Sequence, residues 1–206
     1  MPNLDIEQQL HQQGHTLVAG VDEVGRGSLA GPVVAGAVIL PANIGPSKPW
    51  LRLINDSKKL TPNQRELALT HIHKNAIAVS LGQAEVHEID ALGIVKATKL
   101  AMVRSVKNLP CEPQYLLIDF LHLGESGIEY LALTRGDSRC CSIAAASIAA
   151  KIYRDQLLIQ ADDLYPGYGF RRHKGYGTAE HLRMLKQLGP SPIHRMSFAP
   201  IRPTNS

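Results

Sequence analysis

Two apolar segments of this chain run directly into acidic side chains, and this pattern restricts what the chain can fold into. The segment TLVAGV leads into Asp22 and Glu23, and the segment YLLID ends on Asp119. In an ideal strand Asp22 and Glu23 point to opposite faces, so they can converge only where the strand ends. Gly25 and Gly27 follow and permit such a break. The pattern predicts strands whose ends carry the functional groups of the protein.

Five apolar or β-rich segments bounded by turn residues predict strands. They lie at about 16–22, 32–40, 76–83, 115–119 and 129–134. Two strands come first and the others alternate with helix signals, which is typical of a mixed α/β sheet.

Helices are predicted between and after these strands. Thr61 and Gln64 form a capping box with Pro62 at the first helical position, which predicts a helix to about Asn75. Three-to-four spacing of apolar and small residues predicts another helix within 88–108.

The second half of the chain carries two further helix signals. The alanine-rich segment SIAAASIAAKIYRDQLLIQ predicts a helix whose small side chains allow close packing on a sheet. A last helix is predicted to start after Thr178 and to stop before Gly189. The stretch 165–177, rich in glycine, proline and tyrosine, is the expected linker.

Composition predicts one domain, 1–206, that buries a sizeable core. The chain has 206 residues, of which 44% are hydrophobic and 19% are charged. No apolar run approaches the roughly eighteen residues of a membrane span, and the N-terminus lacks a signal-peptide pattern. Three cysteines are too few for a disulfide scaffold. We expect a cytoplasmic monomer with no membrane partner.

Charge is unevenly distributed along the chain. Residues 165–206 include seven Lys and Arg side chains against Glu180 alone, a net charge of +6. Residues 1–164 include fifteen basic and seventeen acidic side chains, a net charge of −2. A basic C-terminal helical part beside an acidic body favours a polyanionic partner, and a solvated basic face is the plainer alternative.

The segment Gly25–Ala30 formally fits the glycine fingerprint of a dinucleotide-binding, Rossmann-like module. Pro32 interrupts the place where the phosphate-binding helix would begin. No acid occurs between Val24 and Asn55, so the ribose-binding carboxylate is missing. Two carboxylates would also lie beside the pyrophosphate. This module is therefore the weaker alternative.

The carboxylates Asp22, Glu23, Asp119 and Asp137 instead favour a metal site. Four clustered carboxylates repel each other unless hard cations neutralise them, and Mg²⁺ prefers such oxygen ligands. For any one of these acids, capping a helix or facing solvent is the plainer alternative. The combination, with two apolar strands leading directly into acids, favours the metal site.

Five blocks of the sequence, in order and at fitting spacings, resemble bacterial ribonuclease HII. They are AGVDEVGRGSLAGPVVAGAVIL, DSKKLTPNQRE, GDSRCCSIAAASIAAKIYRD, HKGYGTAEHL and LGPSPIHRMSFAP, and the likeness runs from about 17 to 202. The resemblance implies a ribonuclease H-like fold, with a five-stranded mixed sheet flanked by helices and a C-terminal helical part. In that fold the first and fourth strands are neighbours, about 4.8 Å apart.

The resemblance also implies the chemistry. Asp22, Glu23, Asp119 and Asp137 match the acidic set that holds divalent metal, Mg²⁺ or Mn²⁺. The expected reaction is two-metal hydrolysis of a phosphodiester, with one ion activating water and the other stabilising the departing 3′ oxygen. The family cuts on the 5′ side of a ribonucleotide in duplex DNA, and cuts RNA in RNA–DNA hybrids, leaving 3′-hydroxyl and 5′-phosphate ends.

Substrate-binding residues follow from the same motifs. Gly25, Arg26 and Gly27 match the turn whose backbone reads the ribose 2′-hydroxyl, the group that separates RNA from DNA. Tyr176 matches the tyrosine that stacks on the neighbouring sugar. The residues Gly25 to Gly27 also form a tight turn after a strand, which does not exclude the recognition role. For Tyr176, a packing role is the alternative.

Several basic residues are candidates for phosphate contact. The main candidates are Lys58, Lys59 and Lys151. Further candidates are Arg171, Arg172, Lys174 and Arg195. For each, a solvated surface charge is the alternative, and for Lys151 an ion pair with Asp155 along its helix. His173 and His194 lie in matching blocks and are expected to be structural.

The chain departs from the family pattern at three places. Phe120 stands where a small residue such as glycine is common, Gly93 where an asparagine is usual, and Cys140 and Cys141 replace ordinary small or apolar residues.

A third hypothesis for the function is a duplex-binding protein whose acids are purely structural. It predicts binding without cleavage.

Overall fold

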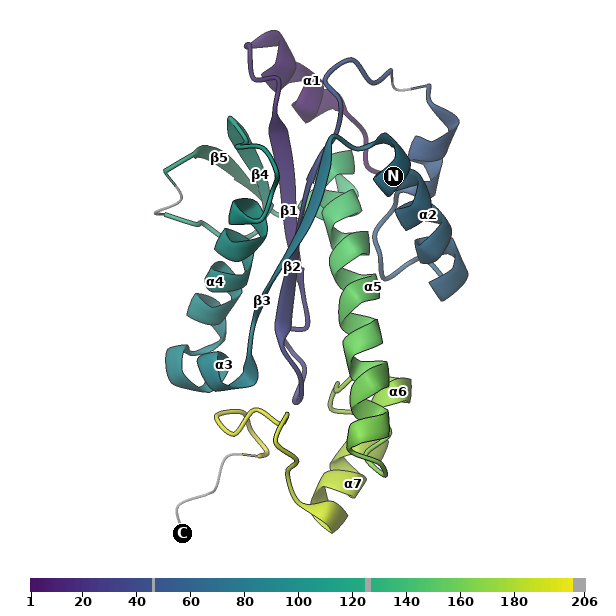
Figure 1. Ribbon diagram of the computed structural model, residues 1–206, viewed down its shortest axis with the longest axis vertical. Helices are drawn as coiled ribbons and strands as arrows, with labels where there is room; N and C mark the ends of the chain where they lie inside the picture. The colour runs from purple at the N-terminus through teal and green to yellow at the C-terminus, as the bar shows by residue number, and fades with distance from the viewer. Residues whose placement is uncertain (46, 125–126, 202–206) are drawn as a thin grey trace.

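The five predicted strands all form and pair into one mixed sheet in the order β3-β2-β1-β4-β5. The computed structural model describes residues 1–45, 47–124 and 127–201. The strands are β1 (Val18–Val24), β2 (Val33–Ile39), β3 (Ala78–Ala84), β4 (Tyr115–Asp119) and β5 (Glu129–Leu133). The sheet is antiparallel from β1 to β3 and parallel from β1 to β5, as Figure 1 shows.

The central strand β1 has two neighbours of different length. Its antiparallel ladder with β2 continues to the pair Val24–Val34, whereas its parallel ladder with β4 ends at the pair Val21–Ile118. The expectation that β1 ends at Asp22 is therefore wrong, because pairing with β2 continues for two more residues. On the side of β4, however, the ladder stops immediately before Asp22 and Asp119, so both carboxylates do follow the end of strand pairing.

Helices occupy the predicted places, with additions. They are α1 (Asp5–Gln12), α2 (Pro62–Asn75), α3 (Val86–Leu92), α4 (Ile94–Lys107), α5 (Cys141–Leu164), α6 (Phe170–His173) and α7 (Ala179–Leu188), with 3₁₀ turns η1 (Pro49–Leu53) and η2 (Gly136–Ser138). The helix predicted within 88–108 is two helices, because Gly93 at a φ of 77° ends α3 before α4 begins. The expected linker 165–177 contains α6.

The capping box of α2 is confirmed. The Thr61 side chain accepts the Gln64 backbone N–H at 3.3 Å, and the Gln64 side chain accepts the Thr61 N–H at 2.9 Å. These two contacts satisfy backbone donors that the first turn of a helix otherwise leaves unpaired.

The sheet has helices on both faces (Figure 1). On one face, buried residues of α4 such as Ala101 and Met102 pack against Val21 and Ala35 of the sheet. On the other, α5 and α2 pack against the opposite side chains of β2 and against η1. No helix in the described part of the chain is both long and apolar enough to cross a membrane.

The alanine-rich helix α5 lies very close to the sheet, as its small residues predict. A Cβ added to Gly20 would overlap the backbone of Ser142, and one added to Gly36 would overlap the Ala146 carbonyl. This close approach places Ser147 of α5 beside Asp22, whose β2 partner is Gly36. Glycine at these strand positions therefore sets the distance between the helix and the candidate site.

The N-terminal helix α1, which the sequence patterns did not predict, anchors the start of α5. Glu7 is 2% exposed and accepts the Ser142 backbone N–H at 2.9 Å and its hydroxyl at 2.8 Å. A carboxylate at a helix N-terminus satisfies free N–H groups and complements the helix dipole. The first turn of α5 is thus held from a segment that is distant in sequence.

We expect Gly36→Ala to lower the free energy of unfolding by about 2 kcal/mol or more, because the added methyl group meets the backbone of α5 rather than a mobile side chain. Urea unfolding measures the change. Gly45→Ala is the matched control, since a Cβ there meets no atom within 4 Å. Equal unfolding midpoints for the two variants would contradict the packing described here.

Candidate active site

Two carboxylates lie side by side where the parallel ladder of β1 and β4 ends. Asp22 and Asp119 each follow the last pair of that ladder, Val21–Ile118. Because parallel strands point their carboxyl ends to the same sheet edge, the two acids reach one location. Asp22 is 4% exposed, and Asp119 is partly buried. The predicted pairing of the first and fourth strands is confirmed.

The other two predicted acids join the same location from neighbouring segments. Glu23 follows Asp22, and Asp137 lies in η2, where the backbone N–H of Gly136 donates to the Asp119 carboxylate at 2.6 Å. Glu23, Asp119 and Asp137 line one open pocket of about 520 Å³. Its other lining residues are Arg26, Asp56, Lys58, Lys59, Phe120, Thr134, Arg135 and Ser138.

Burial, together with repulsion from neighbouring acids, raises the pKa of Asp22, Glu23 and Asp119. Burial raises the pKa of Asp22 well above its usual value, and the charge of Glu23 raises it further, while a hydrogen bond with Ser147 opposes both effects. Burial also raises the pKa of Asp119, against the Gly136 hydrogen bond, and the charge of Asp137 adds to the increase. A cation between these groups would remove that cost.

Two basic side chains, Arg26 and Lys58, interact with these acids. The Arg26 guanidinium donates to Glu23 at 3.2 Å and partly offsets the burial that raises the pKa of this acid. For Lys58, burial lowers the pKa, but the charges of Asp22 and Asp137 outweigh it and raise the pKa overall. The site therefore holds both acidic groups and cations that can meet a phosphate.

The carboxylates converge without forming a ready metal cage. In the described part of the chain, no three Asp, Glu, His or Cys side chains lie close enough together to hold an ion as they stand. Instead Asp22 accepts the Glu23 backbone N–H at 2.7 Å, and Asp119 accepts that of Gly136. Each of these N–H groups binds one carboxylate oxygen, Oδ1, and an ionised carboxylate has a second oxygen that can accept as well.

The chemistry of the acids nevertheless fits a hard divalent cation. All four candidate ligands are carboxylates, which Mg²⁺ and Mn²⁺ prefer. The second oxygen of Glu23, Oε2, is buried and accepts no hydrogen bond from the described residues. A buried oxygen without a donor is costly unless a ligand satisfies it.

Two strained residues border the pocket. Phe120 has a φ of 59° and Arg135 a φ of 56°. For a residue with a side chain, left-handed backbone costs about 1–2 kcal/mol. These positions flank Asp119 and Asp137 in sequence, so the strain lies beside the candidate ligands.

The predicted recognition turn, Gly25–Gly27, is held by a buried arginine. The Ser28 N–H donates to the Gly25 carbonyl at 3.3 Å and closes the turn. The guanidinium of Arg195 donates to the carbonyls of Gly25 at 2.7 Å and Arg26 at 2.8 Å, and also to that of Gly31. Phosphate contact by Arg195 is therefore a wrong prediction, because this side chain is fully buried and its donors are used on the backbone.

A second buried arginine, Arg154 of α5, supports the other side of this segment. It donates to the carbonyls of Pro32 at 2.9 Å, Ala30 at 2.9 Å and Lys174 at 3.0 Å. Gly25 has a φ of 93°, and a Cβ there would overlap the Arg154 side chain. Gly27, in contrast, is exposed, and a Cβ there would meet no protein atom within 4 Å.

Tyr176 lies against this turn. It forms an isolated β-bridge with Ser28, and its ring lies under the Arg154 guanidinium at 5.6 Å. Next to it, Leu29 N–H donates to the Gly175 carbonyl at 2.8 Å. The structure thus brings Tyr176 to the predicted turn across about 150 residues of sequence, as the two motifs require.

Buried histidines fix the backbone of Tyr176. The Ser191 N–H donates to Nδ1 of His194 at 2.8 Å, so the proton of that ring lies on Nε2. His194 Nε2 then donates to Nε2 of His181 at 2.9 Å, and His181 Nδ1 donates to the Tyr176 carbonyl at 2.9 Å. Burial lowers the pKa of both rings, that of His194 to about 4, and keeps them neutral.

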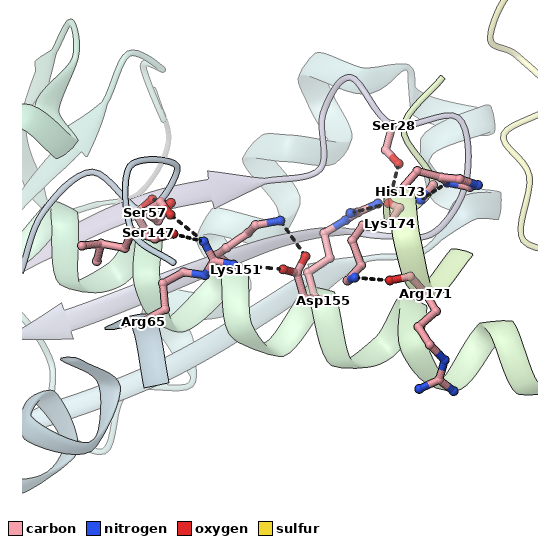
Figure 2. Close-up of polar contacts among 12 residues, drawn as sticks. Ser28, Ser57, Arg65, Ser147, Lys151, Asp155, Arg171, His173 and Lys174 are labelled. Carbon is pink, nitrogen blue, oxygen red and sulfur yellow. Dashed lines mark hydrogen bonds and ion pairs between the residues drawn. The ribbon is translucent and has the colours of Figure 1, made fainter. Parts of the chain in front are cut away.

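Other basic residues that were predicted to contact phosphate already lie close to acidic side chains of the protein. Figure 2 shows Lys151 and Arg65 both directed at Asp155, with the lysine at 2.6 Å and the arginine at 3.8 Å. The alternative stated for Lys151, a pair along its helix, therefore forms. Lys59 lies 3.7 Å from Asp56 and is otherwise exposed.

The remaining basic candidates lie farther along the C-terminal part. Arg171 pairs with Asp163 at 2.7 Å, and Arg172 pairs with Glu180. The carbonyl of Lys174 accepts the Ser28 hydroxyl at 3.2 Å, as Figure 2 shows. Phosphate contact by these residues stays a prediction.

Known structures with the same arrangement of strands and helices define the class. The ribonuclease H2 of Pyrococcus horikoshii OT3 aligns with a TM-score of 0.74 and 27% identity, over 90% of this chain and 95% of that chain. A ribonuclease HIII in complex with Mn²⁺ has the same fold, with a TM-score of 0.63 and 22% identity over 93% of this chain and 70% of that one. The fold is that of a ribonuclease H, and the class is a hydrolase.

Sequence comparison identifies the family within this class. The model of the family described as Ribonuclease HII matches residues 19–201. A ribonuclease HII of Synechococcus sp. is 52% identical over 98% of this chain and 90% of its own length, and one of Chloroflexus aurantiacus is 48% identical over 98% and 95%. This chain belongs to the ribonuclease HII family. The Rossmann-like alternative is excluded by the family and by the loop, not helix, that follows Gly25.

We expect Asp22→Asn to stabilise the metal-free protein at neutral pH. The folded-state pKa of Asp22 is raised, so ionisation of this group costs stability that is present at low pH and lost as the pH rises through the folded-state pKa. Asparagine carries no such charge. In chelator, the variant should therefore melt above wild type at neutral pH, and the difference should shrink as the pH is lowered.

Divalent metal should act in the opposite sense. Adding Mg²⁺ or Mn²⁺ should raise the melting temperature of wild type more than that of Asp22→Asn, because binding to the folded state stabilises it. Glu66→Gln, which removes an exposed acid of α2, is the matched control and should behave as wild type. If Asp22→Asn melts with wild type in chelator and responds equally to metal, the carboxylates are not a repelling metal set.

Proposed function

We propose that this ribonuclease H endonuclease hydrolyses the phosphodiester on the 5′ side of a ribonucleotide in duplex DNA or in an RNA–DNA hybrid, leaving 3′-hydroxyl and 5′-phosphate ends. The observation that carries the proposal is the meeting of Asp22 and Asp119 at adjacent parallel strand ends, with Glu23 and Asp137 at the same location. Membership of the ribonuclease HII family supports the substrate class.

Asp22, Glu23, Asp119 and Asp137 are the proposed metal ligands. Divalent-metal dependence is typical of the family, and the Mn²⁺ complex of a ribonuclease HIII supports either Mg²⁺ or Mn²⁺ here. Two such ions, when bound, supply an activated water for in-line attack and stabilisation of the departing 3′ oxygen. The protein contributes the fixed placement of Asp22 and Asp119 by the strand ladder.

The cations of the site have a separate role in the proposal. Lys58, exposed and held ionised by the surrounding acids, is available to a phosphate of the substrate. Arg26 can pass from Glu23 to a phosphate when the acid binds metal. Lys59 and Lys151 are proposed as weaker contributors, because an aspartate already lies near each ammonium group.

Recognition of the ribonucleotide is proposed for the turn Gly25–Gly27 together with Tyr176. Arg195 holds the turn by its carbonyls, and Arg154 holds the following segment by those of Ala30 and Pro32. A Cβ on Gly27 would meet no protein atom within 4 Å, so this face of the turn is open. An open glycine lets a sugar approach the backbone closely enough to present its 2′-hydroxyl. The Tyr176 ring beside this turn offers a surface for the adjacent sugar.

The protein is further proposed to act as a monomer on cytoplasmic nucleic acid. The single-domain assignment with a basic C-terminal segment from about 165 fits the attachment of that segment to the turn, through Leu29–Gly175 and Gly31–Ile193 backbone hydrogen bonds.

The proposed function is tested with one labelled DNA duplex that carries a single ribonucleotide and with its all-DNA twin. Wild type with Mg²⁺ or Mn²⁺ should cut only the first, on the 5′ side of the ribonucleotide, and chelator should stop the reaction. Asp22→Asn should lose activity by at least about 10³-fold while still binding the duplex. Cutting by the variant or in chelator at the wild-type rate would contradict the metal-dependent mechanism. Binding of the duplex by wild type without any cutting would support the duplex-binding alternative.

Gly27→Ala should fold normally and lose activity on the single-ribonucleotide duplex, because the methyl group meets no protein atom but occupies the face offered to the ribose. We expect kcat/KM to fall by roughly 10-fold or more, the order of one lost buried hydrogen bond. Melting temperature checks the fold. Gly45→Ala is again the control, and an unchanged kcat/KM for Gly27→Ala would remove the recognition role.

A further inference from the structure

Phe120 is an exposed aromatic residue inside a pocket that is otherwise polar. It follows Asp119 directly, lines the same pocket as Glu23 and Asp137, and is 57% exposed. Among the described residues that line this pocket, it is the only large apolar one. Single exposed apolar residues are common on proteins, so exposure alone indicates nothing. The position and backbone of this one carry the inference.

The backbone at Phe120 is held in an unfavourable conformation. The Leu121 N–H donates to the Asp119 carbonyl at 2.7 Å, which closes a three-residue turn with Phe120 at its centre. The central φ is 59°, and such turns with positive φ are rare and strained. Phe120 N–H also donates to the Leu133 carbonyl at 3.0 Å, which ties the turn to β5. Glycine would adopt this conformation without strain.

Packing does not compensate for this strain. In the described part of the chain, the Phe120 ring takes part in no ring–ring or cation–π contact, although other aromatic rings of this protein do. Its side chain belongs to none of the buried apolar clusters. A strained, largely exposed aromatic residue that lies outside the buried apolar clusters and beside the candidate metal ligands points to a contact outside the protein.

We propose that Phe120 is a substrate-contacting residue whose ring packs on the nucleotide next to the scissile phosphate. This inference rests on the proposed function, because it takes the nucleic acid to lie across Asp119. Grooves that bind nucleic-acid strands combine cations for the phosphates with aromatic rings for the flat apolar faces of the nucleotides. Arg26, Lys58 and Phe120, which all line this pocket, provide that combination.

The flat face that Phe120 contacts can be the base or the sugar of that nucleotide. Both are apolar surfaces that a phenyl ring covers, and both lie within one nucleotide of the cut. A duplex with an abasic nucleotide on either side of the ribonucleotide separates them: contact with the base is lost in that duplex, and contact with the sugar remains.

The test measures affinity and stability in the same set of variants. In the non-cleaving Asp22→Asn background, Phe120→Gly should weaken binding of the single-ribonucleotide duplex by about 5- to 150-fold, the range measured for loss of one aromatic–base contact. Its melting temperature should rise by about 2–8 °C, because the strain is relieved. Phe120→Tyr should keep affinity within about twofold of phenylalanine.

Leu67→Ala, which removes an exposed leucine of α2, is the control for the loss of an apolar side chain and should bind as its parent. Phe120→Leu, which keeps apolar bulk without a ring, should bind less tightly than Phe120→Tyr. Unchanged affinity for Phe120→Gly, or a lowered melting temperature, would overturn the inference. That result is distinct from failure of the proposed function, in which wild type itself would not cut the single-ribonucleotide duplex.

Discussion

The repulsion among buried carboxylates at the end of the β1–β4 ladder is the constraint around which this structure is arranged. Parallel pairing brings Asp22 and Asp119 to one sheet edge, and burial raises the pKa of each. Such an arrangement lowers the stability of the metal-free protein, and a shared cation removes that cost. The neighbouring hydrogen bonds from Glu23 and Gly136 backbone N–H groups hold the acids in place without neutralising them.

The proposed recognition turn, Gly25–Gly27, and the segment that follows it depend on a second set of buried charges. Arg154 and Arg195 are both fully buried and direct their guanidinium groups at backbone carbonyls of the segment between β1 and β2. Burial lowers the pKa of Arg195 to about 9, with the Arg154 charge adding to the effect, so it stays protonated at neutral pH. Two buried arginines therefore fix the segment that follows β1 and, through the Lys174 carbonyl, the C-terminal part. In the proposed function this reduces the ordering that substrate binding requires.

The sequence predicts the strands, most helices and the acids well, because these depend on local signals: apolar runs, the capping box at Thr61 and the break before Gly189. It misses features that depend on distant partners. The helix α1 is held by contact of Glu7 with Ser142, and Arg195 resembles a surface charge until its carbonyl partners are known. Gly93, at a φ of 77°, divides one expected helix in two, a glycine break that the three-to-four spacing of apolar residues does not record.

The site was predicted more completely in its residues than in its geometry. The structure brings Asp22 and Asp119 together and brings Tyr176 to the segment that follows the turn Gly25–Gly27, as the resemblance implies. The continuation of β1 beyond Asp22 and the strained turn at Phe120 appear only when β2 and β5 are in place. The expectation that His194 is structural is confirmed, since it is buried and bonded to Ser191 and His181. Its connection through His181 to the Tyr176 carbonyl depends on contacts distant in space, which the sequence did not indicate.

Locating Mn²⁺ by its anomalous scattering, in a crystal of the protein with an uncleavable ribonucleotide-containing duplex, tests the central claim most directly. We expect ions between Asp22 and Asp119, with Glu23 and Asp137 turned toward them and a phosphate oxygen of the duplex in contact. Manganese at other sites, or none within reach of both Asp22 and Asp119, would contradict it.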